Sequence, residues 1–180
     1  MAEFNSMQTI KRRFFAMRNG ILADTLRKGG SPYEMIFGLN LPQLTEIARD
    51  IGPDETIAHA LLDDRRTRES QMLSSLIMPP ESLTTVDVAK SYIDALRSTE
   101  AVDVACLKLL KKTDFVLRLA ESCLGSTDSM QKYAGLRLLW NIYFTYPKEC
   151  RSIASSFSDD DPRLLNMAKT LIEEIDFMDS

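Results

Sequence analysis

The residues best suited to chemistry in this sequence are basic. Arg65, Arg66 and Arg68 form its main cationic cluster. Guanidinium groups bind nucleic-acid phosphates through charge and release counterions as they bind. The same residues also suit a solvated surface without a function, and Arg68-Glu69 can equally pair within the scaffold between adjacent helices. The other cations that can share a surface with these arginines are Arg12, Arg13, Lys108, Lys111, Lys112 and Lys132.

Acidic, histidine and cysteine side chains give weaker indications of chemistry. His59 is the only histidine, and a lone histidine on a helix is more often partly exposed than a metal ligand. Cys106 suits a small buried apolar position better than a nucleophile. Asp103 and Asp114 can form a pair of acids, although surface and capping roles explain them more simply. We therefore expect no metal and no cofactor.

Composition indicates an ordinary globular chain. Of the 180 residues, 44% are apolar and 27% are charged, which predicts a single domain over residues 1–180. No apolar run approaches the roughly 20 residues that a membrane helix needs, so we expect no membrane partner. Three cysteines spaced far apart fit a reducing cytoplasm. The net charge of −4 argues against nucleic-acid binding over the whole surface but allows a local basic face.

Hydrophobic spacing predicts helices throughout, because apolar residues recur at every third or fourth position and no alternating strand pattern occurs. The resulting fold class is all-α, an α-α superhelix of HEAT-like or ARM-like helix pairs with a repeat of roughly 35–45 residues. A globular helical bundle is the alternative. The first expected helix covers 7–28, with a break at Asn19-Gly20. Three further helices follow between Asn40 and Pro80, and Gly52-Pro53 separates the first two. Later helices are expected to begin at Thr84 or Thr85, Thr99, Thr113 and Asp128, and the last two cover 148–157 and 162–177.

Two motifs resemble a known family. The stretch FGLNLPQLTEIARDI, residues 37–51, is similar to a turn of an aromatic residue and a glycine followed by a proline and an amphipathic helix. Arg68-Glu69 before QMLSSLIM is similar to the Arg-Glu start of another helix in the same family. Together they resemble the HEAT-like-repeat DNA alkylation repair proteins of the AlkD type. The resemblance is strongest over residues 37–78 and implies a concave basic face that binds duplex DNA, including alkylated DNA.

The resemblance also implies a chemistry, which this chain retains only in part. Active members of the family excise cationic alkylated purines with the help of tryptophans and an aspartate. Their Trp-Asp-x-x-Asp motif matches the segment beginning at Val102, where Asp103 keeps the first acid and is the candidate catalytic residue. Val102 replaces the tryptophan and Cys106 replaces the catalytic aspartate. A valine has no π face and a thiol does not replace a carboxylate, so weak or lost glycosylase activity is expected.

The sequence therefore leaves two candidate functions of different kinds. The first is a DNA alkylation repair-like protein that binds duplex DNA through Arg65, Arg66, Arg68, Lys108, Lys111, Lys112 and Lys132. The second is a non-enzymatic solenoid that binds a protein or peptide, which the acidic net charge favours.

Overall fold

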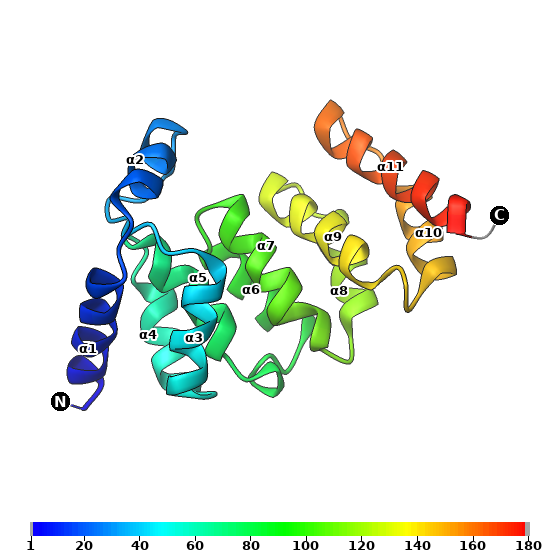
Figure 1. Ribbon diagram of the computed structural model, residues 1–180. Helices are drawn as coiled ribbons and strands as arrows, with labels where there is room; N and C mark the ends of the chain where they lie inside the picture. Colours follow the sequence, from blue (N-terminus) through cyan, green and yellow to red (C-terminus); the bar gives the residue numbers. More distant parts are fainter. Residues whose placement is uncertain (1, 179–180) are drawn as a thin grey trace. The chain divides into compact units, whose positions relative to one another are not determined.

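The computed structural model describes residues 2–178, with side chains from Ser6 onward. Over these residues the chain forms eleven α-helices and two 3-10 turns, and no strand beyond an isolated bridge between Met35 and Thr67 (Figure 1). The all-α prediction is confirmed. The helices are α1 (Ala2–Ala16), α2 (Gly20–Lys28), α3 (Leu41–Ile51), α4 (Glu55–Asp63), α5 (Arg68–Ile77), α6 (Val86–Ala95), α7 (Thr99–Lys108), α8 (Val116–Leu124), α9 (Ser129–Ile142), α10 (Pro147–Ser156) and α11 (Pro162–Met178), with 3-10 turns η1 (Pro80–Ser82) and η2 (Leu110–Lys112).

Several helix starts follow directly from capping side chains. Asn40 accepts a hydrogen bond from the Gln43 amide, and the Gln43 side chain accepts one from the Asn40 amide. This reciprocal pair satisfies two amides that the first turn of α3 leaves without helical partners. Asn19 and Asp128 cap α2 and α9 without the reciprocal bond, because their side chains accept from the amides of Leu22 and Gln131. The predicted break at Asn19-Gly20 and the predicted helix start at Asp128 are therefore confirmed.

Two predicted helix starts are wrong by one to three residues. Ser98, not Thr99, caps α7, because its hydroxyl accepts from the Ala101 amide. Thr113 does not open α8, which begins at Val116. Its hydroxyl instead donates to the Leu110 carbonyl and closes η2. A hydroxyl residue before an apolar run is a weak marker, because it can bond backward as readily as forward.

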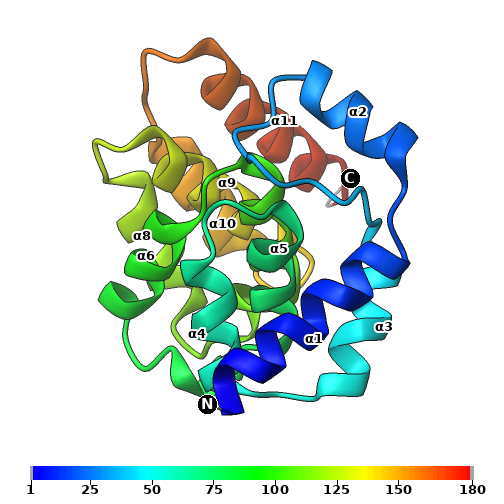
Figure 2. The same cartoon turned by 90° about the vertical axis from the view of Figure 1, so that its left-hand side faces the viewer.

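The described chain divides into two compact units. The first holds residues 2–82 and 95–109, and in it α5 packs against α3, α4 and α7 while α1 lies along α4 (Figure 2). Every residue of α5 except Leu76 is buried. The second unit holds residues 83–94 and 110–178, and in it α9 packs against α8, α10 and α11. A single domain over residues 1–180 stays a prediction.

A register of 32 residues runs through the interactions within each unit. In the first unit, hydrogen bonds join Glu34 to Arg66, Phe37 to Glu69, Arg65 to Arg97, and Arg68 to Glu100. In the second unit, Lys90 donates to Ser122 at the same separation. Interactions at one constant separation are what stacked repeats produce, since each repeat contacts its neighbour at equivalent positions. The observed register is shorter than the expected 35–45 residues.

Candidate functional site

The aromatic-glycine turn and the Arg-Glu helix start form one structural feature. Glu69 is fully buried, and its carboxylate accepts from the backbone amides of Phe37, Gly38 and Leu39 at 2.9–3.3 Å. Gly38 has φ of 80°, and a β-carbon there would lie 2.2 Å from the Asn19 carbonyl oxygen. Only glycine fits this turn, and the turn presents its amides to one carboxylate as a small anion-binding nest.

Arg68 lies in the same buried network, and this placement corrects its prediction as a DNA contact. Its side chain is only 3% exposed. The guanidinium donates to Glu69 at 2.8 Å, to the Leu39 carbonyl at 3.0 Å, and through Nε to Glu100 at 2.7 Å. Burial lowers the pKa of Arg68, but hydrogen bonding and charge from Glu100 outweigh burial and raise that pKa above its ordinary value. The alternative of an ion pair within the scaffold is therefore confirmed for Arg68.

Gln71 extends this network across α5. Its side-chain oxygen accepts from the Tyr33 hydroxyl and from the Arg97 amide, both at 2.9 Å. Its side-chain nitrogen donates to the carbonyls of Leu62 and Ala95. All four hydrogen-bonding capacities of this amide are thus used inside the protein. The polar residues of α5 hold the scaffold together and offer no open site to a ligand.

Asp64 joins this region to α1. Its carboxylate accepts from Ser70 at 2.7 Å and pairs with Lys11 at 2.9 Å. Burial raises the pKa of Asp64, but the hydrogen bonds from Lys11, Ser70 and Thr67 outweigh burial and lower that pKa below its ordinary value. The carboxylate therefore remains charged at neutral pH and balances Lys11 locally.

Arg65 and Arg66 are exposed and meet two further arginines around the Met35–Thr67 bridge. Arg97 donates to the Arg65 carbonyl at 3.1 Å, which brings these two residues together across 32 positions. Arg66 donates to Glu34 at 2.7 Å, and Arg27 donates to the Ile36 carbonyl at 3.1 Å. Glu34 and Ile36 flank Met35, so these two arginines also lie near the bridge. We call these four residues, Arg27, Arg65, Arg66 and Arg97, the arginine edge.

Carboxylates of the chain neutralise only two of the four arginines in the arginine edge. Asp24 pairs with Arg27 and Glu34 pairs with Arg66. Among the residues that the structure describes, Arg65 and Arg97 form no ion pair. Two of the four positive charges are therefore left for an anion from solution, and the edge is a suitable surface for phosphate groups.

The predicted lysines are placed less favourably. Lys108 is half-buried in the last turn of α7. Lys111 and Lys112 lie together in η2 of the second unit. Lys132 is partly buried and paired with Asp159, which reduces its value as a phosphate contact. DNA contacts by these four lysines stay predictions.

The segment that matches the catalytic motif of the family lies mostly in the core. Val102 and Cys106 are fully buried on α7, and Asp103 between them is half-buried. Burial also raises the pKa of the Cys123 and Cys150 thiols to about 12, so those two cysteines are thiols and not nucleophilic thiolates at neutral pH. His59 is exposed beside Glu55. Within residues 2–178, no cluster of histidine, cysteine and acidic side chains has the arrangement of a metal site.

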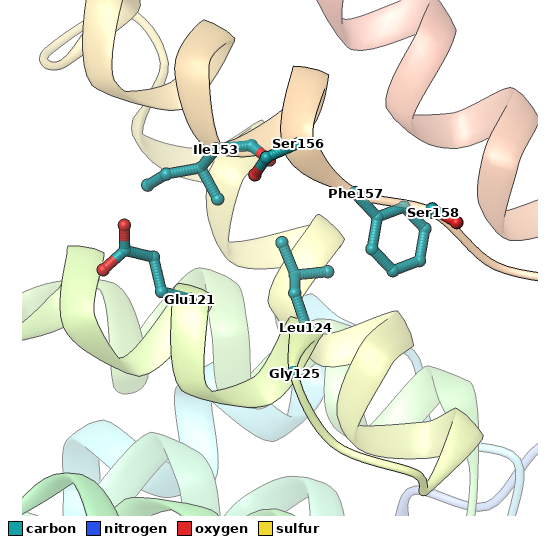
Figure 3. Close-up of a pocket in the computed structure, with 7 residues that line it drawn as sticks. All are labelled: Glu121, Leu124, Gly125, Ile153, Ser156, Phe157 and Ser158. Atoms are coloured by element: carbon teal, nitrogen blue, oxygen red, sulfur yellow. The ribbon is translucent and has the colours of Figure 1, made fainter.

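One cavity of about 380 Å³ lies in the second unit, between the C-terminal ends of α8 and α10. Figure 3 shows Glu121 of α8 facing Ile153 of α10, with Leu124 and the Phe157 ring beside them. The lining residues are Glu121, Leu124, Gly125, Ile153, Ser156, Phe157 and Ser158. This cavity was not predictable from the sequence, because its lining residues belong to two helix ends about 30 positions apart.

No family model, curated protein or solved structure matches the chain. The resemblance to the AlkD type therefore stays a prediction. No described helix is both long and apolar enough to cross a membrane.

The sequence reasoning missed Arg27 and Arg97 as neighbours of Arg65 and Arg66. For Arg97 a signal existed, since it follows Arg65 by the 32 residues that also separate Arg68 from Glu100. Arg27 had no comparable signal, because its place depends on the path of the loop after α2.

Proposed function

We propose that this protein binds duplex DNA through the arginine edge and has weak or no alkylpurine glycosylase activity. The observation that carries the proposal is the meeting of Arg65 and Arg97 beside Arg66, with two of the edge's four guanidinium groups outside any ion pair. Guanidinium groups bind phosphates in a planar, two-pronged geometry. Contacts of this kind position a protein on DNA without reading its sequence.

The burial of α7 supports the catalytic half of the proposal. A glycosylase of the AlkD type needs an aromatic face and a carboxylate next to the deoxyribose, whereas Val102 and Cys106 are both fully buried. Neither side chain can touch a DNA backbone in this conformation. Asp103 alone supplies a single half-buried acid. DNA binding in a cytoplasmic setting, without base excision, is the function that fits these placements.

The test is the affinity for a fluorescently labelled duplex, measured by anisotropy at low salt. The double variant Arg65→Glu/Arg66→Glu reverses two charges at the edge and is expected to weaken binding at least tenfold. Arg49→Glu/Arg118→Glu is the matched control, because it changes the net charge by the same amount at two exposed arginines, on α3 and α8, that are not part of the edge. The control should change affinity by less than about threefold. Equal affinities for the wild type and the double variant would refute the role of the edge.

A protein-interaction role is the second candidate, and exposed aromatic side chains favour it. Phe144 is 71% exposed and Phe177 is 78% exposed. An exposed aromatic side chain offers apolar area that a protein partner can bury. Absence of DNA binding at low salt would favour this second candidate over the first.

A further inference from the structure

The cavity in the second unit has a wall of fixed apolar side chains. Leu124 and Phe157 pack against the buried cluster of Leu136, Leu164 and Ala168. Ile153 contributes a third apolar surface from α10. A volume of about 380 Å³ falls within the range of small-ligand sites. The cavity is therefore large enough for a short aliphatic chain lying against a stable surface.

The polar side of the same cavity is negative. α8 ends at Leu124 and α10 ends at Ser156, so both helices direct their C-terminal ends toward the cavity. The dipole of each helix places a partial negative charge at its C-terminus, and the Glu121 and Cys123 carbonyls of α8 accept from the amides of Gly125 and Ser126. Glu121 adds a full carboxylate at the rim, and Figure 3 shows it facing Ile153 across the opening. No lysine, arginine or histidine is among the residues that line the cavity.

The end of α8 already binds a cation from within the chain. The Lys90 ammonium donates to the Ser122 carbonyl and hydroxyl, both at 3.2 Å. Ser122 lies beside Glu121 but is not among the residues lining the cavity. This contact shows an ammonium group bound at the carbonyl end of α8 and already uses the Ser122 carbonyl, so a second cation at the cavity depends on the Glu121 carboxylate.

We propose that this cavity binds a small organic cation, an ammonium or guanidinium group on an aliphatic stem of about four to six carbons. The stem lies against Leu124 and Ile153. The cationic head lies at the Glu121 carboxylate, and the far end of the stem points toward Leu124 and the Phe157 ring, which Figure 3 shows on the opposite side of the cavity. This proposal does not depend on DNA binding, because the arginine edge belongs to the other unit.

Titration of the ¹⁵N-labelled full-length protein tests the site by amide chemical shifts. The probes are hexylammonium, hexanol and hexanoate, which share one stem and differ in charge. Hexylammonium is expected to shift the amides of Gly125, Phe157 and Ser158 and to bind most tightly of the three. Equal dissociation constants for the three probes, or shifts only outside these amides, would overturn the proposal.

Variants separate the charge of the site from its shape. Glu121→Gln should weaken hexylammonium about threefold to fivefold, as expected for an exposed carboxylate, and leave hexanol unchanged. Glu174→Gln is the matched control, because Glu174 is an exposed acid on α11 that is not among the residues lining the cavity. If both variants weaken hexylammonium equally, Glu121 has no specific role and the proposal fails.

A second arm identifies the source of the cation. Nα-acetyl-lysine N-methylamide carries the same ammonium and stem on a neutral piece of polypeptide. If it binds as tightly as hexylammonium, the site accepts a lysine side chain of another protein. If it binds much more weakly while hexylammonium still shifts the cavity amides, the ligand is a free small amine.

Discussion

At the scale of residues, Glu69 shows how one carboxylate fixes a loop. It is fully buried and accepts three backbone amides and one arginine. Burying a carboxylate is costly unless it is paired and fully hydrogen-bonded. Here every partner comes from the turn at 37–39 or from Arg68, so the turn and the start of α5 form together. The two sequence motifs are one physical unit for that reason.

Glu69→Gln is expected to lower the free energy of unfolding by about 3 kcal/mol. The substitution removes the charge that faces Arg68 and turns an amide donor toward one of the backbone amides that Glu69 now accepts. Urea denaturation followed by circular dichroism measures the change. Glu46→Gln, an exposed position on α3, should change stability by less than about 0.5 kcal/mol. An unchanged midpoint for Glu69→Gln would show that the carboxylate does not hold the turn.

At the scale of elements, the sequence predicted the helices well where capping side chains and glycines mark their ends. Asn40, Gly52 and Asp128 act at short range, so their effect is readable from neighbouring residues. The interior of α5 was not predictable in the same way. Its polar residues are buried because α3, α4 and α7 surround them, and their hydrogen-bond partners include residues 32 and 38 positions away in the sequence.

In the candidate site, too, the sequence predicts features that depend on neighbouring residues but not those that depend on packing. The exposure of Arg65 and Arg66 agrees with the prediction, whereas Arg68 from the same cluster is buried. One residue separates Arg66 from Arg68, and in that interval the chain enters α5. Charge in a sequence does not distinguish a solvated arginine from one that pairs with Glu69 and Glu100. Only the packing of α5 against α7 makes that distinction.

A prediction about α7 follows from the burial of its motif. Val102→Trp/Cys106→Asp restores the residue types of the family motif, yet we expect no release of 7-methylguanine from methylated DNA. Both positions are fully buried, so the tryptophan overpacks the core and the aspartate places an unpaired carboxylate there. Thermal unfolding should show a melting temperature lowered by at least about 10 °C, or no folded protein.

The control for this double variant is Asp114→Asn, which changes an exposed acid just before α8 and should leave the melting temperature within about 2 °C. A double variant that melts like the wild type and releases the methylated base would contradict the expectation. That result would mean that α7 can present these positions to DNA.

At the scale of the whole molecule, the net charge of −4 opposes the approach of DNA. Repulsion from the whole protein acts at long range, whereas the arginine edge attracts phosphates at short range. Added salt screens the repulsion but also removes the gain from counterion release at each phosphate contact. Because the second effect grows with the number of contacts, the dependence of affinity on salt reports how many arginines take part.

The arginine edge offers two unpaired guanidinium groups and two that already hold carboxylates. Two to four phosphate contacts predict that the logarithm of the binding constant falls with the logarithm of salt concentration at a slope of about −2 to −4. Anisotropy titrations at several sodium chloride concentrations measure this slope. Arg65→Glu/Arg66→Glu should bring the slope toward zero by about two, because each removed contact contributes about 0.9. Measurable binding with the same slope in the wild type and in this variant would place the DNA on another surface, since the contacts that release counterions would then lie elsewhere.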